Sequence, residues 1–158
     1  MSGSRPIRYE LAIEIARPPA EVYAYLADPT HLREWQQDVE EVRDAPGGPL
    51  AVGGAFTEVR SFLGKRAEST LEATVAEPGR QLCRLTVFHA VVVTIRHLLE
   101  PAGEGTLVRV EADADAGKLL GLGGPLLRKA AERRARGDFE RLAEPVLSRQ
   151  QWGYDILL

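Results

Sequence analysis

Residues 7–35 read IRYELAIEIARPPAEVYAYLADPTHLREW and open with a regular alternation of apolar and polar side chains. Every odd position from Ile7 to Ile15 is apolar, which predicts a strand with one buried and one solvated face. Pro19 suits the first turn of a helix, where its missing N–H needs no partner. Asp28-Pro29 ends that helix, because the residue before a proline is pushed out of the α region. A second short helical piece ends near Trp35.

Turn-forming residues divide the next part of the chain into six more predicted strands, at 38–43, 56–63, 67–75, 82–88, 91–100 and 106–115. In the first of these, Val39 and Val42 are three residues apart, which suggests a bulge or an edge strand. Since short turns join successive strands, we expect an antiparallel sheet.

One long helix follows a glycine-rich joint at residues 117–124. It is predicted to begin at Pro125 and to run to about Ala143, with Pro145 ending or kinking it. Its apolar stripe has helical spacing and comprises Leu127, Ala130, Ala131, Ala135, Phe139, Leu142 and Val146. This helix is the only large element available to cover one face of the sheet.

The composition of the chain limits its number of domains, its compartment and its partners. A chain of 158 residues fits one domain, 1–158, that buries about 70% of its unfolded surface without a metal or a disulfide. The single cysteine, Cys83, fits a reducing compartment, and no signal peptide or membrane span is evident, so we expect a cytoplasmic protein. A net charge of −3 argues against nucleic acid as a partner. Three lysines and no asparagine suggest a GC-rich bacterial genome.

Several segments together resemble the SRPBCC superfamily, the START-like helix-grip group, and most closely its polyketide cyclase/dehydrase branch. They are residues 18–23, 26–29 and 32–35, the turn at 100–106 and the joint at 117–121. The resemblance covers a core at 7–147 and leaves an apolar tail at 148–158. It implies an α+β helix-grip fold, in which a curved antiparallel sheet of about seven strands wraps around a long C-terminal helix, with two short helices after the first strand.

The resemblance also implies a cavity for hydrophobic molecules between sheet and helix. The residues support this independently, because small side chains such as Ser69, Ala73 and Ala112 on the sheet face Ala131 and Ala135 on the helix. Two such surfaces either pack closely or leave space, and we favour space. The predicted pocket lining is Trp35, Phe56, Ser69, Leu71, Ala73, Leu85, Ile95, His97, Val108, Val110, Leu127, Ala131 and Ala135.

The sequence identifies no catalytic group, but three side chains are candidates for moving protons. His97 lies in an apolar register, although a lone histidine there is more often a hydrogen-bonded wall residue. Arg60 could bind a carboxylate or enolate oxygen if it points inward, as could Arg84, and an outward orientation is favoured for both. Tyr25 is the third candidate. Arg134 and Asp138, one helical turn apart, suit a surface ion pair.

No metal or cofactor is expected. The three histidines and one cysteine lack metal-ligand spacing, and the glycines at 121–124 match neither a dinucleotide fingerprint nor a P-loop.

Three functions remain open. The first is binding of an apolar small molecule that resembles a polyketide, lipid, sterol or quinone. The second is a polyketide aromatase/cyclase or dehydratase acting in the same cavity. The third is a membrane-associated lipid or quinone carrier that uses the basic residues of 118–149, although a solvated helix face explains those charges more simply. The apolar tail at 150–158 would cover the cavity mouth or, as we favour, form a homodimer contact.

Overall fold

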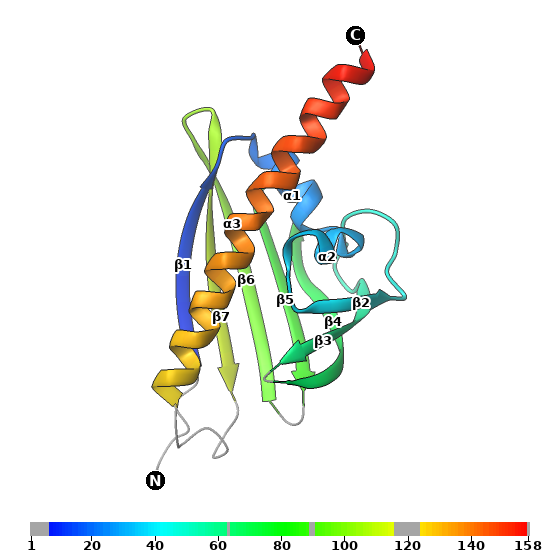
Figure 1. Ribbon diagram of the computed structural model, residues 1–158. Helices are drawn as coiled ribbons and strands as arrows, with labels where there is room; N and C mark the ends of the chain where they lie inside the picture. The colour runs from blue at the N-terminus through cyan, green and yellow to red at the C-terminus, as the bar shows by residue number, and fades with distance from the viewer. Residues whose placement is uncertain (1–6, 63, 89–90, 116–123, 158) are drawn as a thin grey trace.

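The computed structural model describes residues 7–62, 64–88, 91–115 and 124–157. The elements follow the predicted order of one strand, short helices, six strands and a long helix (Figure 1). They are β1 (Ile7–Ile15), α1 (Pro19–Leu26), the 3₁₀ turn η1 (Pro29–His31), α2 (Leu32–Trp35), β2 (Val39–Arg43), β3 (Ala55–Phe62), β4 (Lys65–Glu77), β5 (Gln81–Phe88), β6 (Val91–Ala102), β7 (Gly105–Asp115) and α3 (Gly124–Leu157).

The strands form one antiparallel sheet in the order β1-β7-β6-β5-β4-β3-β2. Every consecutive pair from β2 to β7 is joined as neighbours, and β1 closes against β7 at the far edge. The register shifts once in β2, between Val39 and Glu41, and once in β4, between Ala73 and Val75. Such bulges increase local twist, which helps a seven-stranded sheet to curve. The predicted α+β helix-grip architecture and the predicted irregularity in β2 are therefore confirmed.

Strand pairing defines which side chains share a face. Leu82 pairs with His97, His97 with Val110, and Val110 with Leu11, and all four are buried. This face looks toward α3, which packs against β1, α1 and α2, and we call it the inner face (Figure 1). The residues between them, such as Arg96 and Arg109, are exposed on the outer face. Within the described residues, no helix combines the length and hydropathy needed to cross a membrane.

The prediction for the last helix was wrong at its C-terminal end. Pro145 does not end α3, which continues for 34 residues from Gly124 to Leu157. A proline removes one backbone hydrogen bond from a helix, and the neighbouring turns can hold the segment helical at a local energetic cost. The last turns of α3 project beyond the end of the sheet, so the backbone of the tail continues the helix away from the sheet instead of folding back over it (Figure 1).

Candidate functional site

Burial along the inner face is uneven. Near the end of the strands that lies against α1 and α2, the inner-face residues are almost fully buried. We call this the closed end: Leu11, Ile15, Phe56, Ala73, Leu82, Arg84, His97, Leu99, Thr106, Val108 and Val110. Toward the β3–β4 and β5–β6 hairpins, several inner-face residues are only half-buried, although Glu58 opposite Ser69 is buried. We call this the open end: Ala67, Ser69, Thr86, Val91, Val93, Ile95 and Ala114.

The packing of α3 explains this difference. Leu126 is 75% exposed, residues 128–130 are exposed, and Ala135 is the first fully buried side chain of the helix among those described. From Ala135 onward, Phe139 and Leu142 are buried in the core at 4% and 0% exposure. The middle turns of α3 therefore cover the closed end, whereas its first turns are exposed.

Three polar side chains of α3 fasten the helix to the end of α2 and to the residues that follow it. Arg134 Nε lies 2.8 Å from Asp38 Oδ2, and Arg141 Nε donates to the Trp35 carbonyl at 3.2 Å. Asp138 accepts the backbone N–H of Gln37 at 3.4 Å and also pairs with Arg141. These contacts lie within two helical turns, so they fix both the position and the rotation of α3 over the closed end.

The predicted surface ion pair between Arg134 and Asp138 is wrong. Asp138 is only 6% exposed and takes Arg141 as its partner, while Arg134 bonds to Asp38. Burial raises the pKa of Asp138, and the Gln37 N–H and the Arg141 charge partly oppose that shift.

His97 lies at the centre of the closed end. Its ring is 5.6 Å from the Phe139 ring, which in turn lies 5.1 Å from Trp35. The histidine is 3% exposed, and its Nδ1 lies 3.3 Å from the Leu82 carbonyl. Burial, reinforced by the nearby Arg84 charge, lowers the pKa of His97 to about 3, so the imidazole is neutral at pH 7. These contacts are those of a hydrogen-bonded wall residue.

Arg60 points inward, contrary to the orientation favoured from the sequence. It shares the inner register of β3 with Phe56 and Glu58. Glu58 receives two hydrogen bonds from Arg60, at 2.9 and 3.2 Å, and the Gln36 side chain receives a third at 2.7 Å. Burial acts to lower the pKa of Arg60, but the Glu58 charge and hydrogen bond, together with Asp138 and Asp38, outweigh it and raise that pKa.

Arg84 also points inward, and the outward orientation favoured for it is wrong as well. It is 5% exposed and pairs across the sheet with Ala73 and Ile95. Its Nη2 donates to the Leu26 carbonyl at 3.1 Å, and its guanidinium lies 5.9 Å from the centre of the Phe56 ring. Burial lowers the pKa of Arg84 to about 10, so the group remains a cation at neutral pH.

Tyr25 belongs to a different cluster from these arginines. Its ring stacks on His31 with centroids 4.4 Å apart, and its hydroxyl donates to Glu34. His31 also lies 3.0 Å from Glu34 and 3.5 Å from Asp28. His31 belongs to η1, Glu34 to α2 and Asp28 to the turn before them, so this cluster lies on the short helices that follow β1.

Tyr9 was missed by the sequence analysis. Burial raises its pKa to about 12, Arg60 opposes the shift, and Asp138 and Glu132 add to it. The phenol of β1 therefore lies within electrostatic reach of a β3 arginine and of two α3 carboxylates, although β1 and β3 lie near opposite edges of the sheet. Sheet curvature thus brings groups from distant strands toward one shared interior, which a period-two pattern alone cannot reveal.

The remaining predicted lining residues fall into four groups. Trp35, Phe56, Leu71, Ala73, Val108, Val110 and Ala135 are buried in the core. Ser69, Ile95 and Ala131 are half-buried. Leu85 pairs with Glu72 and Thr94 on the outer face, so its place in the lining was wrong by one residue of register. The side chain of Leu127 lies outside the described part of the structure.

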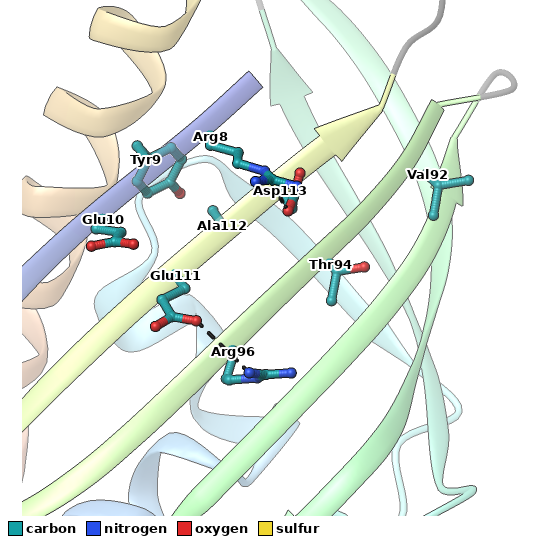
Figure 2. Close-up of a pocket in the computed structure, with 9 residues that line it drawn as sticks. All are labelled: Arg8, Tyr9, Glu10, Val92, Thr94, Arg96, Glu111, Ala112 and Asp113. Carbon is teal, nitrogen blue, oxygen red and sulfur yellow. Dashed lines mark ion pairs between the residues drawn. The ribbon is translucent and has the colours of Figure 1, made fainter. Parts of the chain in front are cut away.

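Two grooves with volumes of about 420 and 590 Å³ lie on the outer face. The first, shown in Figure 2, is bordered by charged side chains of β1, β6 and β7. Arg8 lies 3.0 Å from Asp113, and Arg96 lies 3.9 Å from Glu111. These are mutually paired charges on solvated strands, and α3 lies behind the sheet in this view. Among the described residues, no group of three or more His, Cys, Asp or Glu side chains is arranged to hold a metal ion.

Comparison with known structures agrees with this architecture. Protein CV1439 from Chromobacterium violaceum has a TM-score of 0.72 at 17% identity, over 89% of this chain and 96% of that chain. A START superfamily protein from Mycobacterium smegmatis has a TM-score of 0.72 at 17% identity, over 89% and 97%. The protein TTHA0849 from Thermus thermophilus has a TM-score of 0.69 at 20% identity, over 92% and 99%. At these identities the likeness establishes the fold.

At the level of sequence, no curated protein matches the chain. A family model does match it, under the description "Polyketide cyclase / dehydrase and lipid transport", over residues 6–146. That range takes in all seven strands, both short helices and the part of α3 that covers the sheet. The chain therefore belongs to the polyketide cyclase/dehydrase and lipid-transport family, and it adopts the START-like helix-grip fold.

Proposed function

We propose that this protein binds an apolar small molecule on the inner face of the sheet, with the open end as the entrance. The observation that carries the proposal is the burial gradient: aliphatic side chains of β6 near the β5–β6 hairpin remain half-buried, and the first turns of α3 are exposed. Partly exposed apolar surface that continues into a buried apolar interior is typical of a ligand entrance. The family description names lipid transport and polyketide chemistry, and this supports an apolar small molecule as the ligand.

Small side chains favour this location. Val93 pairs with Thr86 on one side and Ala114 on the other, and Ser69 and Ala67 line the same end on β4. None of these fills much volume, so a guest of a few rings or a short acyl chain would contact several strands at once. Burial of such a guest would be favourable by roughly 25 cal/mol for each Å² of apolar surface removed from water.

The groups considered for catalysis are held by structural partners. His97 is neutral and bonded to the backbone, Arg60 is engaged by Glu58 and Gln36, and Tyr25 is engaged by Glu34. For this reason we propose binding and not an aromatase/cyclase or dehydratase reaction.

Native mass spectrometry of freshly purified protein is the first experiment, and the expected result is a co-purified apolar adduct that leaves on denaturation. Titration with the neutral dye Nile red then locates the site. Val93→Trp, on the inner face, should weaken binding by about tenfold or more, because the indole fills the entrance. Val92→Trp is the matched control, since the adjacent Val92 is 40% exposed on the outer face. Equal loss in both variants, or no saturable binding together with no adduct, would contradict the proposal.

A further inference from the structure

The polar interior contains a cation whose hydrogen-bonding capacity is only partly used. Arg84 is 5% exposed, and its Nε has no hydrogen-bond partner among the described residues. Its one hydrogen bond in that part of the structure goes to a neutral carbonyl, that of Leu26. The described residues place no carboxylate within ion-pair distance of it. Burying a charge without a paired counter-charge is costly, so this arrangement calls for an explanation.

The neighbouring arginine, Arg60, shows how this fold provides hydrogen-bond partners for an inward cation. Arg60, two strands away on the same face, donates to both oxygens of Glu58 and to the side-chain oxygen of Gln36. Glu58 also acts electrostatically on Arg84, but it already accepts two hydrogen bonds from Arg60. The interior therefore holds two inward guanidinium groups, and Glu58, the carboxylate that acts on both of them, is hydrogen-bonded to Arg60.

A second unpartnered group lies within electrostatic reach of Arg84. The Tyr23 side chain is 2% exposed, and its hydroxyl oxygen also lacks a hydrogen-bond partner among the described residues. Burial raises the pKa of Tyr23, and the Arg84 charge opposes that shift, as expected for groups within electrostatic reach of one another. A phenol O–H and a guanidinium N–H are both donors, and together they suit an oxygen acceptor with negative charge.

Arg84 lies where a guest that enters from the open end would reach the closed end. Its cross-strand partner on β6 is Ile95, and the next inner residue along β5 is Thr86, both half-buried residues of the open end. On the other side, Arg84 faces the small side chain of Ala73 on β4. The backbone of Arg84 thus stands at the boundary between the accessible and the sealed parts of the inner face, and its guanidinium reaches the Leu26 carbonyl of α1.

We infer that the ligand carries an anionic oxygen, namely a carboxylate, enolate or phenolate, on an otherwise apolar skeleton, and that Arg84 Nε and the Tyr23 hydroxyl donate hydrogen bonds to this oxygen. The inference rests on the proposed function, because it assumes that a guest occupies the inner face. Arg84 is then a specificity-determining residue: the apolar part of the guest lies against the half-buried strands, and the anion restores the missing counter-charge.

Matched pairs of probes test this directly. Dodecanoate and methyl dodecanoate differ only in the charge of the end group, as do 2-naphthoate and methyl 2-naphthoate. By calorimetric titration at neutral pH, the wild-type protein should bind at least one acid about tenfold or more tightly than its ester. Arg84→Met should remove that preference and leave the affinity for the ester within about threefold. Arg84→Lys should retain part of it, since an ammonium keeps the charge but lacks the planar fork.

Arg96→Met is the control, because it removes one positive charge from the outer face, where Arg96 pairs with Glu111. It should keep the acid preference of the wild type. If Arg84→Met does not fold, the Nε–H resonance of Arg84 in the wild-type protein gives a second readout. That resonance should move on titration with the acid and stay in place with the ester.

The outcomes separate this inference from the proposed function. If acid and ester bind the wild-type protein equally, as an internal water on Arg84 would allow, the inference is overturned and the binding function stands. If neither member of either pair binds and Nile red does not saturate the protein, the proposed function fails with it.

Discussion

Phe139→Ala tests the packing of α3 against the closed end of the sheet. Phe139 is 4% exposed, and its ring lies 5.1 Å from Trp35 and 5.6 Å from His97. Truncation of a buried phenylalanine to alanine costs about 3–5 kcal/mol, which includes the cavity left behind. Against a typical total stability of about 5–15 kcal/mol, that is a large fraction. The expected fall in Tm is roughly 6–20 °C for a domain of this length.

Urea unfolding followed by circular dichroism measures this change without relying on tryptophan signals. Leu126→Ala on the same helix is the control: Leu126 is 75% exposed, so its truncation should change the free energy of unfolding by no more than about 0.5 kcal/mol. If Phe139→Ala and Leu126→Ala have equal effects, α3 does not grip the sheet at Phe139, and the division into a closed and an open end is wrong.

Three further predictions concern pH, backbone sterics and a surface ion pair. Because the folded pKa of His97 is lowered to about 3, the unfolded chain binds the proton first, so stability should fall as pH drops below about 6.5. His97→Gln should flatten that pH dependence of the urea midpoint. Gly105→Ala should destabilise strongly, since its Cβ would lie 2.5 Å from a β1 carbonyl oxygen, whereas Gly47→Ala meets nothing within 4 Å and should be nearly neutral by thermal melting. Asp38→Asn should cost less than about 1 kcal/mol, because the Arg134 pair it weakens is partly exposed, and a loss of several kcal/mol would contradict that view.

The architecture could be predicted because its signals are local and repeated. The alternation of Ile7 to Ile15, the proline at the start of α1 and Asp28-Pro29 after it each act through backbone geometry within a few residues. The spacing of Val39 and Val42 likewise indicated the irregularity that appears as a register shift in β2.

The polar interior could not be predicted in the same way, because its pairings join distant segments. The orientation of Arg60 depends on Glu58, which has the same parity in β3, and on Gln36 after α2. The sequence shows Arg60 in register with Phe56, but arginines are so often solvated that the outward orientation was favoured, and the acidic Glu58 of the same register was not considered as its partner. Leu85 was misplaced because one residue of register reverses the face of a side chain.

The C-terminal end of α3 shows that a proline in the sequence does not by itself predict where a helix ends. Pro145 was taken as a stop or a kink, yet the helix continues through it to Leu157. Proline penalises a helix interior without forbidding it, so the energy of the surrounding turns decides the outcome. The homodimer contact suggested by the apolar residues of the tail stays a prediction.

The most direct test of the account is to observe where an apolar guest touches the sheet. With methyl-labelled protein and Nile red, intermolecular nuclear Overhauser effects should connect the dye to the methyl groups of Val91, Val93 and Ile95 on the inner face. Effects confined to Leu85, Val87 and Val92 on the outer face would contradict the central claim that the guest enters between the curved sheet and α3.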